Sequence, residues 1–266
     1  MNTFIVALKH EAQPLIEEDG LTLLSHEPFK VYQNQSARLV ISGVGQKASF
    51  AATNFALTDH AKHHGLWINL GVAGHRHLPS GTPVTISKVT DKTTARAWYP
   101  ATRRTPYHQI KELITCQNPT NNYPSEECCD MEAAGFMAAV SKIIPCEHIH
   151  VLKIISDNAN IHPNTLTKLH LRELIKKNLT ATYTYIKEAQ QYLAVNPKTF
   201  PPAADAIFKK WHFTFTQTQQ LLELYRSFAA VCPDERWPNV NLNECNKASQ
   251  VLTKLSAQLT QLSPSL

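Results

Sequence analysis

The sequence predicts an α/β fold, with a mixed, mainly parallel central sheet flanked by helices and a C-terminal helical extension. Three observations predict this fold. Short runs that are apolar throughout alternate with segments of helical periodicity. Such strands are typical of a parallel sheet covered on both faces. The composition then changes after residue 195, where Pro197, Pro201 and Pro202 indicate a linker. We therefore expect an α/β domain over 1–195 and a helical extension over 196–266.

The elements of the α/β domain follow from apolar runs and the turn residues between them. Residues 31–40 predict a hairpin, because Asn34-Gln35-Ser36 supplies a turn between two apolar arms. Asn164, which follows a proline, can cap a long helix running to about residue 193. The other predicted strands are 4–8, 66–70, 83–89, 112–116 and 149–155, and the other predicted helices are 47–62 and 130–143.

The extension contains two amphipathic stretches, 216–231 and 244–262, separated by Pro233 and Pro238. This pattern predicts a helical hairpin. A helix pair this short does not bury two apolar faces well enough to be stable alone. We therefore expect the extension to pack on the α/β domain or on a second subunit, with a homodimer as the outcome.

Composition and charge exclude several classes of partner. The 266 residues carry a formal net charge of +5, and the basic residues are scattered. A nucleic-acid groove needs a clustered basic face, so no nucleic-acid partner is expected. No apolar run has the length of a membrane span, and the N-terminus lacks the features of a signal peptide. The six cysteines form no disulfide framework, which favours a cytoplasmic location.

Three acidic residues stand at the ends of predicted elements. Glu11 follows the first strand, Glu132 lies in the first turn of a helix, and Asp157 ends a strand. In a mainly parallel sheet, ligands bind at the carboxyl ends of the strands, so the three side chains can converge on one crevice. Each of them alone is also explained by capping or by the helix dipole. Periodicity does not decide between these interpretations.

Four segments, in order, resemble the signatures of the nucleoside phosphorylase/nucleosidase superfamily, and within it the 5′-methylthioadenosine/S-adenosylhomocysteine nucleosidases. The resemblance covers residues 4 to about 193. The matching segments are Ala7-Leu8-Lys9-His10-Glu11, Ser42-Gly43-Val44-Gly45-Gln46-Lys47-Ala48, Asn69-Leu70-Gly71-Val72-Ala73-Gly74 with the strand at Pro83-Val84, and Asp130-Met131-Glu132-Ala133-Ala134 with Ile155-Ser156-Asp157.

The resemblance implies a reaction and a role for each matching residue. The N-glycosidic bond of a purine nucleoside breaks through an oxocarbenium-like state. The residue matching Asp157 protonates the purine N7, and the residue matching Glu11 takes a proton from the attacking water. Glu132 is expected to bind the ribose hydroxyls. The other substrate-binding residues implied are Met131, Ser156, Gly71, Val72 and Ala73.

The chain also departs from the superfamily pattern. Phosphorylases hold phosphate with polar and cationic residues at positions that align with Asn69 and Val72 here, which favours water as the nucleophile. The segment between Val84 and Met131 is short, and in relatives it carries the aromatic residue that stacks on the base. Tyr123 is the best stacking candidate, with Trp98 and Tyr99 behind it.

The sequence therefore predicts a purine-nucleoside N-ribosyl hydrolase acting on adenosine-type or 5′-thio-modified nucleosides. A phosphate-dependent phosphorylase and a non-catalytic nucleoside-binding protein stay open as alternatives. No cofactor and no metal are expected, because the histidines complete no zinc pattern. Packing is the preferred explanation for Cys128 and Cys129, since no neighbouring histidine would activate either thiol. The histidines considered are His60, His63, His64, His148 and His150.

Overall fold

The computed structural model describes residues 1–58, 65–120, 123, 126–195, 205–231 and 240–262. It divides into two compact units, Met1–Gln190 and Gln191–Leu266. Several features discussed above lie outside the described residues: the end of the predicted helix 47–62, His60, His63, His64, and the prolines at 197, 201, 202, 233 and 238.

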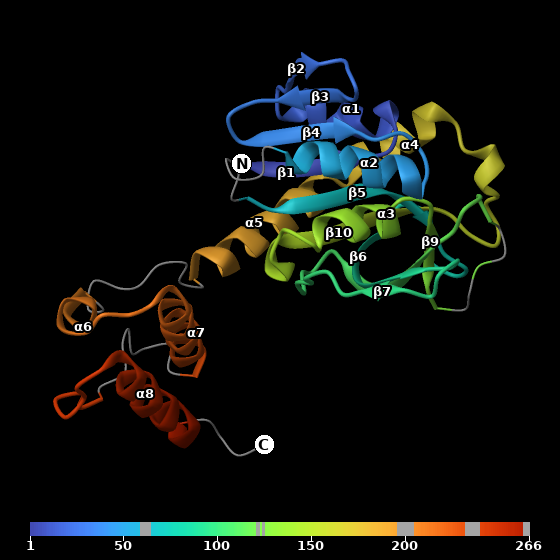
Figure 1. Cartoon of the computed structure of the whole chain (residues 1–266). Helices are drawn as coiled ribbons and strands as arrows, with labels where there is room; N and C mark the ends of the chain where they lie inside the picture. Colours follow the sequence, from blue (N-terminus) through green and yellow to red (C-terminus); the bar gives the residue numbers. More distant parts are fainter. Residues whose placement is uncertain (59–64, 121–122, 124–125, 196–204, 232–239, 263–266) are drawn as a thin grey trace. The chain divides into compact units, whose positions relative to one another are not determined.

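A ten-stranded sheet forms the centre of the first unit, in the order β10-β6-β8-β9-β5-β1-β4-β3-β2, with β7 paired to β6 (Figure 1). Strand β10 also pairs with β5, so β5, β9, β8, β6 and β10 form a closed circuit. The strands are β1 Asn2–Val6, β2 Thr22–Ser25, β3 Lys30–Gln33, β4 Ala37–Ile41, β5 Trp67–Gly74, β6 Pro83–Asp91, β7 Ala97–Trp98, β8 Gln109–Thr115, β9 Cys128–Asp130 and β10 Ile149–Asp157.

The mixed α/β fold is confirmed, but the expectation of a mainly parallel sheet is corrected. Strand β1 is parallel to β4 and β5, β10 is parallel to β5, and β8 is parallel to β6 and β9. As many pairings are antiparallel: β2–β3, β3–β4, β5–β9, β6–β7 and β6–β10. The tight turns around β2, β3 and β4 require antiparallel neighbours, since parallel strands need a long crossover.

Helices cover both faces of the sheet. Helices α2 (Gln46–Leu57) and α3 (Ala133–Val140) pack together over one face and share a core with the strands. Figure 1 shows α1 (Lys9–Glu18), α4 (Lys168–Lys177) and α5 (Leu179–Val195) on the other side. The strand residues in the core with α2 and α3 include Ile5, Val40, Trp67, Val151 and Ile155, which are all buried.

Two predicted helices begin later than expected. The segment after Asn164 is a 3₁₀ turn, and α4 begins only after Thr167, whose hydroxyl caps it by accepting the His170 N–H at 3.1 Å. Asp130 does not start a helix but ends β9. Its carboxylate accepts the Ala133 N–H at 2.8 Å and so caps α3 from the preceding strand. Glu132 therefore stands at the N-cap of α3 and not in its first turn.

The second unit contains α6 (Asp205–Lys210), α7 (Phe215–Val231) and α8 (Ala248–Leu262). Helices α7 and α8 agree with the predicted hairpin, whereas α6 was not predicted. Their buried core consists of Ile207, Trp211, Leu221, Phe228, Cys245, Ala248, Val251 and Leu255. The apolar stripes thus meet within the unit. None of the described helices combines the length and apolar character that a membrane span requires.

Candidate active site

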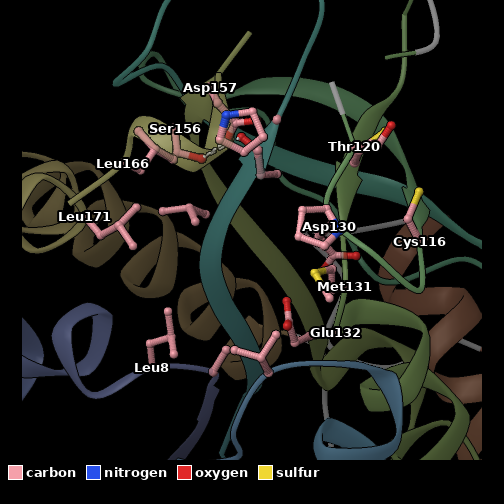
Figure 2. A pocket seen from close by; sticks show the side chains of 18 of the residues that line it. Leu8, Cys116, Thr120, Asp130, Met131, Glu132, Ser156, Asp157, Leu166 and Leu171 are labelled. Atoms are coloured by element: carbon pink, nitrogen blue, oxygen red, sulfur yellow. Dashed lines mark hydrogen bonds between the residues drawn. The ribbon is translucent and has the colours of Figure 1, made fainter. Parts of the chain in front are cut away.

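A cavity of about 230 Å³ lies at the carboxyl ends of β1, β5 and β10. Residues far apart in the sequence line it: the start of α1, the end of β5, the junction of β9 and α3, and the end of β10. Figure 2 shows Ser156 and Asp157 at one end of the pocket and Glu132 at the other. The predicted site residues in the lining are Glu11, Val72, Ala73, Tyr123, Met131, Glu132, Ser156 and Asp157.

Gly71 is the predicted site residue that is absent from this lining. It lies inside β5, beside Glu11 and Lys153: a Cβ at this position would contact Glu11 Oε1 at 3.5 Å and Lys153 Nζ at 3.7 Å. These are ordinary van der Waals distances, so Gly71 lies directly beside the Glu11 carboxylate.

Glu11 is held by two backbone amides. Its Oε2 accepts the Leu8 N–H at 3.0 Å, and its Oε1 accepts the Val72 N–H at 3.2 Å. The first bond belongs to the start of α1, and the second ties the helix to β5. The side chain is 3% exposed. Burial, and next the Glu132 carboxylate, raise the pKa of Glu11 to about 7. A carboxylate with such a pKa can take up a proton near neutral pH.

Glu132 is fixed by the glycine loop that precedes α2. Its Oε1 accepts the Gly45 N–H at 2.8 Å. Gly45 has a φ of 100°, a conformation that favours glycine, so the loop places this amide where a side-chain-bearing residue would be strained. Burial, and next the Asp130 carboxylate, raise the pKa of Glu132.

Lys153 is a cation of the site that the sequence analysis missed. Its Nζ lies 2.9 Å from Asp130 Oδ2, and both side chains are almost fully buried. Burial opposes its charge, but the Asp130 and Glu132 carboxylates raise the pKa of Lys153 above its ordinary value. Lys153 thus stays protonated and compensates the buried carboxylates. A lysine inside the otherwise apolar strand 149–155 was the signal that could have revealed it.

Both carboxyl oxygens of Asp157 accept a hydrogen bond from a hydroxyl. The Ser156 hydroxyl donates to Oδ1, and the Tyr123 hydroxyl donates to Oδ2. Asp157 ends β10 and is 6% exposed. Burial, and next the hydrogen bond to Asp157, raise the pKa of Tyr123, which therefore remains a hydroxyl donor.

Two further parts of the lining are an apolar wall and a sulfur-bearing wall. The apolar wall comprises Leu8, Val44, Pro163, Leu166 and Leu171, and the second wall includes Cys116, Cys129 and Met131.

Two other aromatic residues considered for stacking lie elsewhere. Trp98 belongs to the core formed with α2 and α3, and Tyr99 is 64% exposed. Neither lines the pocket. Cys128 is buried in the same core, whereas Cys129 reaches the cavity beside Cys116.

Among the described residues, no group of three or more histidine, cysteine, aspartate or glutamate side chains is arranged to hold a metal ion. His148 and His150 contact backbone carbonyl oxygens of Gly65 and Ala101, each at 3.1 Å. Both histidines therefore have backbone partners in the segments that flank the strands.

The fold is similar to that of several solved nucleosidase structures. The chain superposes on a 5′-methylthioadenosine/S-adenosylhomocysteine nucleosidase from S. pneumoniae bound to a transition-state inhibitor, with 16% identity, a TM-score of 0.57, and coverage of 70% of this chain and 99% of that one. Futalosine hydrolase of Helicobacter pylori matches with 14% identity, a TM-score of 0.57, and coverage of 70% and 97%.

The 5′-methylthioadenosine nucleosidase of Arabidopsis thaliana, in its apo form, matches with 16% identity and a TM-score of 0.55, over 72% of this chain and 94% of that one. No protein-family model and no curated protein sequence matches the chain. The structural matches confirm the predicted nucleosidase-like fold.

Proposed function

We propose that the first unit is a purine-nucleoside N-ribosyl hydrolase. The observation that supports this most strongly is the composition of the pocket. Four carboxyl groups, those of Glu11, Asp130, Glu132 and Asp157, line one cavity whose described lining contains no lysine, arginine or histidine. Such a site favours the positive charge that develops on the ribose when its bond to the base breaks.

Three of these carboxyl groups have distinct tasks in the proposed reaction. Asp157 donates a proton to N7, so that the purine leaves as a neutral molecule. Glu132 binds the 2′ and 3′ hydroxyls and stabilises the ribosyl cation. Glu11 takes a proton from the water that attacks C1′, and its pKa of about 7 suits a base that works near neutral pH. Met131 packs against the nucleoside.

Water, and not phosphate, is the proposed nucleophile. Phosphate binding needs charge-assisted donors. Asn69, at one of the positions that hold phosphate in phosphorylases, is buried in β5, where its amide donates to the Ile5 carbonyl at 3.2 Å. The nearest buried cation, Lys153, is paired with Asp130. A phosphate would therefore face carboxylates without a free cation in the described lining.

The apolar wall supports a nucleoside with an apolar 5′ substituent. In Figure 2, Leu8, Leu166 and Leu171 lie along one side of the pocket between Glu132 and Asp157. A 5′-alkylthio group buries apolar surface against such a wall, whereas a charged 5′ group is desolvated there without compensation. We therefore propose adenosine-type or 5′-thio-modified nucleosides as the substrates. A cytoplasmic location and a homodimer, both expected from the sequence, complete the proposal.

The test is incubation of the full chain with a panel of purine nucleosides, with and without phosphate, followed by chromatography for the free base. Base and free ribose are the expected products under both conditions, with 5′-methylthioadenosine cleaved faster than adenosine. Ribose 1-phosphate formed only with phosphate would identify a phosphorylase. The absence of base release from every nucleoside would leave only a binding function. Light scattering measures the predicted dimer.

Glu132→Gln provides a control within the same panel. The variant should raise KM and lower kcat for ribonucleosides, because an amide binds the hydroxyls less strongly and no longer stabilises the cation. A 2′-deoxynucleoside should be a poor substrate for the unmodified chain. Equal rates on ribo- and deoxyribonucleosides would contradict the assignment of Glu132.

A further inference from the structure

Tyr123 makes a contact that base stacking does not require. Its hydroxyl donates to Asp157 Oδ2 across 34 positions of the chain. Its ring packs directly on Gly74, where a Cβ would collide with both the ring and Asp157 Oδ2. The absence of a side chain at Gly74 thus creates the space in which the phenol reaches the carboxyl group.

The hydroxyl contact is compatible with proton donation by Asp157. A carboxyl oxygen has two lone-pair positions, so Oδ2 can carry a proton toward the base and still accept a hydrogen bond from Tyr123. When the proton has moved to N7, Asp157 is left as an anion in a site where it is 6% exposed. A buried carboxylate is costly unless donors stabilise it, and hydrogen bonds to a charged acceptor are the strong ones.

We propose that Tyr123 is a positioning residue for the general acid: its hydroxyl orients Asp157 and stabilises the carboxylate that remains after proton transfer to the base. This inference rests on the proposed nucleosidase function and extends it to a residue outside the matching motifs. Ser156 provides the second hydroxyl, on Oδ1, from the same strand as Asp157. The two donors together leave neither oxygen of the carboxylate without a partner.

The neighbouring side chains described next do not donate to the Asp157 carboxyl group, so its side-chain donors are the hydroxyls of Tyr123 and Ser156. Cys116 and Cys129 pack beside Tyr123 on the pocket wall. His75, which follows β5, donates its backbone N–H to the Asp157 carbonyl at 3.0 Å and directs its ring toward the Glu126 carbonyl. Burial lowers the pKa of His75, which keeps this ring neutral. Glu132 lies at the other end of the cavity (Figure 2).

The experiment compares Tyr123→Phe with the unmodified full chain over a pH series. The phenylalanine ring preserves packing and stacking and removes only the hydroxyl. We expect kcat to fall about 10- to 100-fold, as for the loss of a hydrogen bond to a charged group, with little change in KM. Loss of a donor favours the protonated acid, so the alkaline limb of kcat/KM should move to higher pH.

Two further variants separate the hydroxyl from the ring. Tyr123→Leu should additionally raise KM, because it removes the stacking surface. Tyr107→Phe, at a half-exposed tyrosine away from the pocket, is the matched control and should leave all parameters unchanged. A Tyr123→Phe enzyme with unmodified kcat and pH profile would overturn the proposal, whether or not the leucine variant raised KM.

A second measurement does not depend on turnover. Carbon NMR, with Asp157→Asn to assign the resonance, observes the Asp157 carboxyl group directly. At a fixed pH its chemical shift should change in Tyr123→Phe and stay the same in Tyr107→Phe, and an unchanged shift in Tyr123→Phe would overturn the inference. If the unmodified chain releases no base from any nucleoside, the proposed function fails, while the NMR measurement still decides whether the Tyr123 hydroxyl acts on the Asp157 carboxyl group.

Discussion

At the scale of single residues, the site is a set of buried carboxyl groups held by backbone amides, hydroxyls and one lysine. Glu11 meets the amides of Leu8 and Val72, and Glu132 meets that of Gly45. Lys153 offsets part of their charge through Asp130. The balance leaves the pKa of Glu11 at about 7, which suits the proposed base and carries a local cost to stability.

Asp157→Asn tests the proposed general acid. An amide has one acceptor oxygen, so it can accept from only one of the Tyr123 and Ser156 hydroxyls, and it has no acidic proton to give to N7. We expect turnover of purine nucleosides to fall roughly 10²–10⁴-fold, with an unchanged circular dichroism spectrum. Base release is measured by chromatography at several enzyme concentrations. Near-normal rates in the variant would remove Asp157 from this role.

The proposed role of Glu11 as the base predicts the acid limb of the pH profile. The base must be deprotonated to accept a proton from water, and burial raises the pKa of Glu11 to about 7. We therefore expect kcat/KM to fall as the pH drops below about 7. A profile that stayed level down to pH 5 would contradict the assignment of Glu11 as the base. Glu11→Gln should be inactive at every pH.

The same pKa predicts a change in the free energy of unfolding. The pKa of Glu11 is raised in the folded chain from 4.5 to about 7, so the folded state binds more protons than the unfolded state between these values. Stability should consequently decrease as the pH rises through this range, by up to roughly 3 kcal/mol. Urea unfolding of Glu11→Gln at pH 5 and pH 8 should lack this component. An identical pH dependence in both proteins would count against it.

At the scale of elements, the contact between α2 and α3 positions the Glu132 end of the site, which we propose binds the ribose. Gly135 in α3 faces the carbonyl of Gln46, the first residue of α2, and a Cβ at Gly135 would collide with that oxygen. Gln46 follows Gly45, whose amide holds Glu132. The close approach of the two helices therefore sets the position of the amide that orients Glu132.

Gly135→Ala tests this coupling between packing and binding. Helix propensity alone would make the alanine variant more stable, by about 1 kcal/mol. Because the carbonyl of Gln46 blocks the new methyl group, we expect the opposite, a loss of roughly 1–3 kcal/mol, together with a raised KM. Ala138→Gly in the same helix should cost stability only and leave KM unchanged. Urea unfolding and steady-state kinetics measure both effects, and a stabilised Gly135→Ala variant would disprove the clash.

At the scale of the whole molecule, the site and the extension belong to different units. Every described residue that lines the pocket lies within Met1–Gln190, whereas α6, α7 and α8 share a core of their own. The sequence analysis expected each apolar face of the extension to need an outside partner. Part of these faces is instead buried inside the second unit, where Ile207 and Trp211, in and next to α6, belong to the same core as α7 and α8.

A chain ending at residue 198 tests whether the first unit contains every residue needed for activity. We expect it to retain kcat and KM for the best nucleoside, because no residue of the described lining is removed. Light scattering on the same preparations shows whether the predicted homodimer depends on the extension. Loss of turnover in a truncated chain that remains folded would show that the extension contributes to catalysis.

Local patterns in the sequence were sufficient for most of the elements, whereas the roles of the acidic residues stay predictions. Apolar runs and turn residues predicted the strands around Phe4, Ile68 and Val151, because burial of a strand depends on residues that are adjacent in the chain. Motif resemblance predicted Glu11, Glu132 and Asp157. The predicted starts of α3 and α4 were too early, because Asp130 and Asn164 are residue types that often cap helices.

Only the tertiary structure showed that the sheet closes through β10 and β6, that Lys153 lies buried among carboxylates, and that the Tyr123 hydroxyl reaches Asp157. These features depend on residues separated by tens of positions, which no periodicity within a single segment encodes. The sequence shows that residue 153 is a charged lysine and that residue 123 is a tyrosine with a long side chain. Their partners are not, because burial and hydrogen bonding are decided by which strands become neighbours.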